Sequence, residues 1–111
     1  MLNKMIDAAA FAKMKRGAVL INTARGGVAD TDALIDALRS GHLSGAGLDV
    51  YPDEPNVPEI LKQMPNVVLT PHIGTNTYEA RRGMAQAAAE RILTVLDGRV
   101  PPNIVNRNLR K

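Results

Sequence analysis

The chain has 111 residues, 45% of them hydrophobic, which is enough for one domain with an apolar core. Its net charge is only +3 and aromatic residues make up 3%, so a nucleic-acid partner is not expected. Because cysteine is absent, histidines number only two and no apolar run is long enough to span a bilayer, we expect no metal site, no membrane partner and a cytoplasmic location.

The first half of the chain predicts one strand with a helix before it and a helix after it. Asp7 is placed to cap a helix over residues 7–15. Residues 18–23 (AVLINT) are an apolar run that is typical of a fully buried strand in the middle of a parallel sheet. A second helix begins with Asp30 as its cap and ends before Gly41.

The second half of the chain predicts two more strands and the longest helix. Residues 44–50 form a short strand of small residues, followed by a proline-rich loop and a brief helix. The next strand covers residues 66–70. The longest helix covers residues 76–97, with Asn76 and Glu79 spaced as a capping box. Because strands alternate with helices, the pattern predicts an α/β fold with a parallel sheet.

Side chains that could take part in catalysis or binding stand at or after the end of each of the three predicted strands. Arg25 comes after the first strand and His72 after the third, while Asp49 ends the second and Glu54 lies shortly beyond. The carboxyl ends of parallel strands share one edge of a sheet, so we expect these side chains to converge. Arginine can bind a carboxylate, histidine can move a proton near neutral pH, and a neighbouring acid stabilises the imidazolium. Such a set suits proton transfer coupled to chemistry at a carbonyl carbon that bears a carboxylate.

Each of these residues also has a purely structural interpretation. Arg25 would be an ordinary surface arginine and Glu54 a solvated acid of a loop. Asp49 would cap a turn, and His72 would bind the backbone at the end of a strand. His42 lies in a helix–strand connection and has no acid or arginine at a matching strand end, so we expect it at the surface.

Three blocks of sequence carry a resemblance to a known family. They are residues 14–27 (MKRGAVLINTARGG), residues 45–50 (GAGLDV) with Glu54 and Pro55, and residues 66–74 (NVVLTPHIG). In this order the blocks resemble the D-isomer-specific 2-hydroxyacid dehydrogenases, and the match continues to residues 102–106. Residues 74–81 (GTNTYEAR) are most similar to the glyoxylate and hydroxypyruvate reductase branch.

The resemblance implies a role for each matching residue. Arg25 would bind the carboxylate and carbonyl oxygen of the substrate, His72 would be the acid/base, and Glu54 would be its acidic partner. NADH or NADPH would supply the hydride, and the substrate would be a small 2-oxo or 2-hydroxy acid. The positions that match the surroundings of the nicotinamide are Thr23, Ala24, Arg25, Asp49, His72, Ile73 and Gly74.

The resemblance also implies a domain organisation. Residues 1–100 would be the second half of a Rossmann-like nucleotide-binding domain with its long C-terminal helix. Residues 101–111 would form an extended tail that belongs to a substrate domain missing from this chain. The family's glycine-rich phosphate-binding turn would also be missing, because residues 45–50 begin like one but end in valine and precede no helix.

From this organisation we expect a truncated polypeptide that is catalytically silent by itself. An exposed sheet edge and apolar helix faces predict a homodimer or association with the missing N-terminal half. The alternative, from another class of function, is a non-catalytic binding or oligomerisation module of the same fold, as in the C-terminal-binding-protein corepressors.

Overall fold

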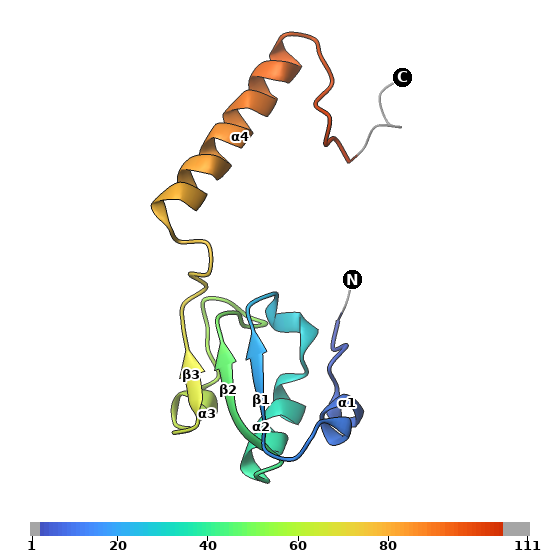
Figure 1. The fold of residues 1–111 in the computed structure, drawn as a ribbon, viewed down its shortest axis with the longest axis vertical. Helices are drawn as coiled ribbons and strands as arrows, with labels where there is room; N and C mark the ends of the chain where they lie inside the picture. The colour runs from blue at the N-terminus through green and yellow to red at the C-terminus, as the bar shows by residue number, and fades with distance from the viewer. Residues whose placement is uncertain (1–2, 106–111) are drawn as a thin grey trace. The chain divides into compact units, whose positions relative to one another are not determined.

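The computed structural model describes residues 3–105, which belong to two compact units, Met1–Gly74 and Thr75–Lys111. The first unit contains a three-stranded sheet with short helices, and the second consists of one long helix and the segment after it (Figure 1). No helix in the described part of the chain is both long enough and apolar enough to cross a membrane.

The sheet of the first unit has the strand order β1-β2-β3, and both pairs of strands are parallel. The expected α/β fold with a parallel sheet is therefore confirmed. The elements of this unit are α1 (Ala8–Lys13), β1 (Ala18–Asn22), the 3₁₀ turn η1 (Gly26–Val28), α2 (Thr31–Arg39), β2 (Leu43–Leu48), α3 (Glu59–Lys62) and β3 (Val67–Leu69).

The core of the first unit lies between the helices and one face of the sheet. Phe11 of α1, Leu43 of β2 and Leu61 of α3 are each at most 2% exposed. Leu34 and Leu38 of α2 join the same buried cluster. Because α1, α2 and α3 all contribute to this one cluster, no helix among the described residues of this unit covers the opposite face of the sheet.

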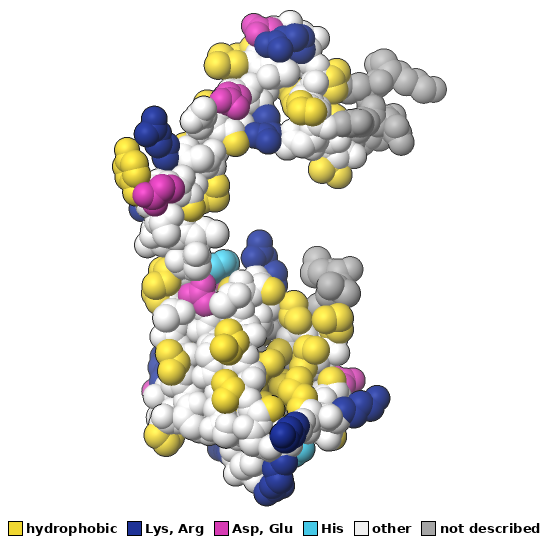
Figure 2. Space-filling model, in the orientation of Figure 1, with side chains coloured by type: hydrophobic (Ala, Val, Ile, Leu, Met, Phe, Trp, Pro, Cys, Tyr) yellow, Lys and Arg dark blue, Asp and Glu magenta, His cyan; other side chains and the backbone are white. Residues whose placement is uncertain are grey.

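β1 is an edge strand within the described residues, and only one of its faces is covered. Leu20 packs against the core, whereas Val19 and Ile21 on the other face are 60% and 71% exposed. Val68 of β3 is 68% exposed, and hydrophobic side chains are visible on the sheet face in Figure 2. The expectation of a fully buried central strand is therefore wrong here, because an apolar run predicts a strand but not how many of its faces are covered.

Local capping signals coincide with the starts of α1 and α2. The Asp7 carboxylate accepts a hydrogen bond from the Ala10 N–H at the start of α1. The Asp30 carboxylate accepts hydrogen bonds from the N–H groups of Asp32 and Ala33 at the start of α2. These caps are predictable because the residues that make them are neighbours in the chain.

His42 closes the end of α1 and is not a free surface residue. Its Nε2 lies 2.9 Å from the carbonyl oxygen of Phe11 and 3.1 Å from that of Met14. Since carbonyl oxygens only accept, Nε2 carries the proton and donates to two carbonyls at the end of α1, of which that of Phe11 also accepts from the Met14 N–H. The expectation that His42 lies free at the surface is therefore wrong. The sequence pattern could not show these bonds, because the partners lie about thirty residues away in the chain.

The second unit is built on α4, which spans Tyr78–Leu96. The long C-terminal helix is confirmed, but its cap is Thr77, whose Oγ1 accepts a hydrogen bond from the Ala80 N–H at 3.1 Å. The capping box expected from Asn76 and Glu79 is thus wrong: the cap lies one residue later, and Ala80 has no side-chain acceptor to complete a box. Two capping residue types stand side by side here, and their spacing alone does not choose between them.

The segment after α4 turns back within the second unit. The Ile104 N–H donates to the carbonyl of Pro101, and the Asn103 side chain accepts a hydrogen bond from Arg91 of α4 at 2.9 Å. An extended tail was expected over residues 101–111, and its described part contains this turn. The remainder of that tail, residues 106–111, lies outside the described residues.

Candidate active site

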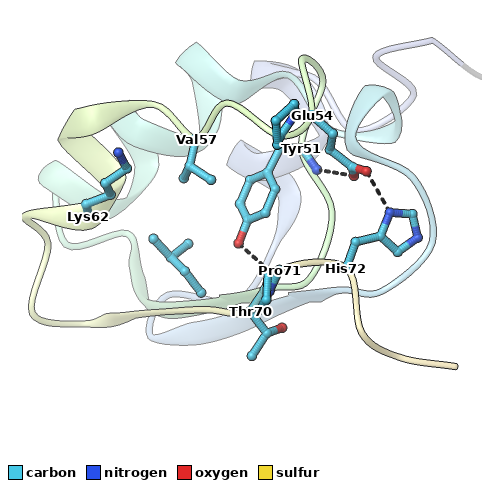
Figure 3. A pocket seen from close by; sticks show the side chains of 9 residues that line it. Tyr51, Glu54, Val57, Lys62, Thr70, Pro71 and His72 are labelled. Carbon is cyan, nitrogen blue, oxygen red and sulfur yellow. Dashed lines mark hydrogen bonds and ion pairs between the residues drawn. The ribbon is translucent and has the colours of Figure 1, made fainter. Parts of the chain in front are cut away.

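Glu54 and His72, which the sequence places after neighbouring strands, are in direct contact. The Oε2 atom of Glu54 lies 2.6 Å from Nδ1 of His72. The other carboxylate oxygen, Oε1, accepts a hydrogen bond from the Tyr51 N–H at 3.0 Å. Figure 3 shows the Glu54 carboxylate between the backbone of Tyr51 and the imidazole ring. Because Nδ1 is held by the carboxylate, Nε2 is the ring nitrogen left to meet a ligand.

The surroundings of Glu54 keep its carboxylate ionised. Its pKa is lowered from the ordinary glutamate value, first by the hydrogen bond with His72 and then by the bond from Tyr51. The charges of His72 and Arg25 act in the same direction, while burial opposes them. An ionised Glu54 fixes the orientation of the imidazole and stabilises its protonated form.

Arg25 lies at the same edge of the sheet but does not touch the acid–base pair. Its Nη1 donates to the carbonyl of Ala24 at 2.6 Å, and its side chain makes no hydrogen bond to Glu54 or His72 among residues 3–105. Asn22 fixes the turn by accepting from the Ala24 N–H and donating to the Arg25 carbonyl. The positive charge of Arg25 helps to lower the pKa of Glu54, and Arg25 is an exposed residue.

Asp49 connects the end of β2 to the segment that carries His72. Its Oδ1 accepts hydrogen bonds from the Thr70 hydroxyl at 2.6 Å and from the Ile73 N–H at 2.9 Å. Its Oδ2 accepts from the Gly74 N–H at 2.9 Å. These bonds, that from Thr70 first, hold the pKa of Asp49 below its ordinary value. Three positions expected around a nicotinamide, Asp49, Ile73 and Gly74, are thus joined to one another.

Thr23 and Ala24, also expected near a cofactor, lie in the turn between β1 and η1. Directly after this turn, the first residue of η1 packs closely on the loop after β2, since a Cβ added at Gly26 would lie only 2.0 Å from the carbonyl carbon of Tyr51. The sequence pattern assigns no role to Gly26, and the double glycine was the only signal available. The contact brings the turn that carries Arg25 against the loop that carries Glu54.

Tyr51 is a second residue that the sequence pattern does not single out. Its hydroxyl lies 2.9 Å from the carbonyl oxygens of both Leu48 and Thr70, which joins the ends of β2 and β3. Burial raises the pKa of the Tyr51 phenol, so it remains a neutral donor. Its ring borders a cavity of about 370 Å³, mostly apolar, that reaches the pair of Glu54 and His72 (Figure 3). A cavity of this volume can hold a small ligand.

Comparison with known proteins leads to one group of enzymes. Residues 2–74 match the family described as "D-isomer specific 2-hydroxyacid dehydrogenase, NAD binding domain". The chain is 52% identical over 96 residues to the glyoxylate reductase of Thermococcus litoralis. The aligned segment covers 86% of this chain and 29% of that protein. This chain spans about a third of the length of the curated relatives that it matches.

Solved structures share the fold as well as the sequence. A protein from Thermus thermophilus matches with a TM-score of 0.86 and 50% identity, over 94% of this chain and 33% of that one. The NADPH-dependent glyoxylate/hydroxypyruvate reductase from Sinorhizobium meliloti, in complex with NADP and malonate, matches with a TM-score of 0.81 and 38% identity. That match covers 84% of this chain and 29% of the reductase.

Proposed function

This chain belongs to the D-isomer specific 2-hydroxyacid dehydrogenase family, and from that membership we propose that it provides the acid–base part of an NAD(P)-dependent reductase of small 2-oxo acids. The contact of 2.6 Å between Glu54 and His72 is the observation that carries the proposal. It lies at the carboxyl edge of a parallel sheet, where α/β proteins bind ligands. Glyoxylate is the first substrate to test, because the relatives from Thermococcus and Sinorhizobium are named for it.

In the proposed reaction a 2-oxo acid gains a hydride at its carbonyl carbon and a proton at its carbonyl oxygen, which gives a 2-hydroxy acid. His72 donates that proton from Nε2, while Glu54 holds Nδ1 and stabilises the protonated ring before transfer. Arg25 binds the substrate carboxylate with its guanidinium and polarises the carbonyl. In the opposite direction the neutral His72 accepts the proton from the hydroxyl group.

The residues around Asp49 fit the nicotinamide end of a dinucleotide. A Cβ at Gly74 would lie 3.2 Å from Asp49 Oδ2, so the missing side chain lets the carboxylate approach the backbone closely. Oδ2 accepts one hydrogen bond, from the Gly74 N–H, and a carboxylate oxygen can accept a second, which we assign to an amide group of the cofactor. A bound NADH or NADPH would supply the hydride. We keep both cofactors, because the family description names NAD and the Sinorhizobium reductase holds NADP.

We propose that the open face of the sheet is covered in the assembled protein, either by a second copy or by the upstream part of the same domain. Val19, Ile21 and Val68 form an apolar face that a single unit leaves in water. The same face favours the second candidate function, a non-catalytic binding or oligomerisation module. The domain division at residue 100 and the cytoplasmic location stay predictions.

A chimera tests the proposed function. The segment of the Thermococcus litoralis glyoxylate reductase that aligns with this chain is replaced by this chain, and glyoxylate reduction is followed by cofactor absorbance with NADH and NADPH. We expect turnover, and we expect His72→Asn and Glu54→Gln to lower kcat by roughly 10²–10⁴-fold. Arg25→Lys is expected to raise the KM for glyoxylate, because a single ammonium cannot replace a bidentate contact.

Asp53→Asn is the matched control, because Asp53 neighbours Glu54 but, within residues 3–105, its side chain bonds to Asn56 alone. It should leave kcat unchanged. An active chimera in which His72→Asn keeps its kcat would refute the assigned roles. The 111-residue chain assayed by itself is expected to show no turnover. Calorimetric titration with NADH and with NADPH then shows whether this inactive chain binds either cofactor.

A further inference from the structure

The backbone of His72 lies in the left-handed region, with a φ of +54°. Residues other than glycine adopt this region rarely and stay there only where surrounding contacts determine it. The direction of the His72 side chain follows from this conformation, and with it the contact with Glu54. Whatever holds this turn therefore sets the geometry of the acid–base pair.

One carboxylate binds the chain on both sides of His72. Before it, the Thr70 hydroxyl donates to Asp49 at 2.6 Å. After it, the N–H groups of Ile73 and Gly74 donate to the same carboxylate, each at 2.9 Å. Asp49 is only 6% exposed, so water competes little for these bonds.

Both partners of the short hydrogen bond are themselves fixed to the sheet. The N–H of Asp49 donates to the carbonyl of Asn22 at 3.0 Å, which ties Asp49 to the end of β1. The N–H of Thr70 donates to the Leu48 carbonyl at 2.9 Å, and the Thr70 carbonyl accepts from the Tyr51 hydroxyl. The Thr70 side chain is therefore presented to Asp49 from a rigid position.

We propose that Thr70 and Asp49 form a clamp that positions His72 against Glu54, an inference that rests on the proposed acid–base role of His72. A carboxylate has about four acceptor positions, and residues of the His72 segment fill three of them. Asp49 thus spends most of its acceptor capacity on the turn that carries His72. Thr70 is a positioning residue, since its hydroxyl acts on His72 only through Asp49.

Nuclear magnetic resonance of the 111-residue chain tests the clamp without any need for turnover. In Thr70→Val, which keeps the side-chain shape and removes the hydroxyl, the amide protons of Ile73 and Gly74 are expected to exchange roughly tenfold faster. The cross-relaxation contact between the His72 ring and the Glu54 side chain is expected to weaken. Thr70→Ser retains a hydroxyl and is expected to restore both signals.

Thr94→Val is the matched control for this substitution. The Thr94 hydroxyl bonds to the Glu90 carbonyl within α4, in the other unit of the chain. Its loss should leave the exchange of Ile73 and Gly74 unchanged. Unchanged exchange and ring contact in Thr70→Val, or failure of Thr70→Ser to restore them, would overturn the clamp.

The chimera separates the clamp from a role in cofactor binding. Thr70→Val leaves the Asp49 carboxylate in place, so we expect a lower kcat with an unchanged KM for the cofactor. A raised KM with an unchanged kcat would mean that Asp49 serves the cofactor alone, and would overturn the clamp. An inactive chimera together with faster exchange in Thr70→Val would support the clamp and refute the proposed reductase function.

Discussion

Gly26 lies where the turn after β1 meets the loop after β2, and we expect this contact to tolerate no side chain. A Cβ there would lie 2.0 Å from the carbonyl carbon of Tyr51 and 2.3 Å from the nitrogen of Pro52. Carbon atoms in ordinary contact are about 3.5–4.0 Å apart, so one segment would have to retreat by about 1.5 Å. Both neighbours are backbone atoms, which cannot rotate aside as a flexible side chain can.

We therefore expect Gly26→Ala to cost about 3 kcal/mol of unfolding free energy, at the upper end of overpacking in a protein interior. At about 4–8 °C per kcal/mol for a domain of this size, the Tm falls by about 12–24 °C. Thermal unfolding followed by circular dichroism measures the shift. In the chimera the same variant is expected to lower kcat/KM for glyoxylate, because the retreat moves the Arg25 turn away from Glu54.

Gly83→Ala provides a control with the opposite expected sign. Gly83 lies within α4, and no heavy atom would come within 4 Å of an added Cβ. Alanine favours the helix over glycine by about 0.5–1 kcal/mol, so this variant should stabilise α4. If Gly26→Ala unfolds within about 2 °C of the parent chain, the two turns are not packed as described.

Three further predictions concern the core, the pH dependence and the open sheet face. Leu43 is fully buried, so Leu43→Ala is expected to cost about 2–5 kcal/mol in urea unfolding; a loss below about 1 kcal/mol would contradict the described core. The lowered pKa of Glu54 means that its bonds stabilise the chain above the ordinary pKa of 4.5 and that this contribution is lost as the pH falls through the lower folded-state value. The difference in Tm between the parent and Glu54→Gln should thus be largest near neutral pH and shrink below pH 4.5. A difference independent of pH would refute the link between Glu54 ionisation and stability. Ile21→Lys places a charge on the open face, so sedimentation velocity should show it as monomeric while the parent chain self-associates at micromolar concentration; a monomeric parent counts against the dimer.

The sequence predicts best what neighbouring residues decide among themselves. The caps Asp7 and Asp30 are confirmed because cap and helix lie within three residues of each other. The pairing of Glu54 with His72 is expected from the rule that parallel strands end at one edge, and the contact is present. That rule places Arg25 at the same edge but fixes no distance, and the guanidinium reaches the pair only by charge.

Features that depend on distant segments escape the sequence pattern. The open face of β1 depends on what covers the sheet, which the run AVLIN does not encode. The bonds from His42 to the end of α1 and from Thr70 to Asp49 join residues more than twenty positions apart. Only the fold brings such partners together, so spacing alone could not assign them.

The hydrogen bonds of Asp49 and Glu54 to the segment around His72 span only 18–25 residues of chain. Their acceptors all precede their donors, so on a ribosome both carboxylates emerge before the imidazole does. Closing so short a stretch costs little chain entropy, and domains fold from the N-terminus as they are made. These bonds lie entirely within Met1–Gly74, so the pairing of Glu54 with His72 is set by residues that are translated before the second unit.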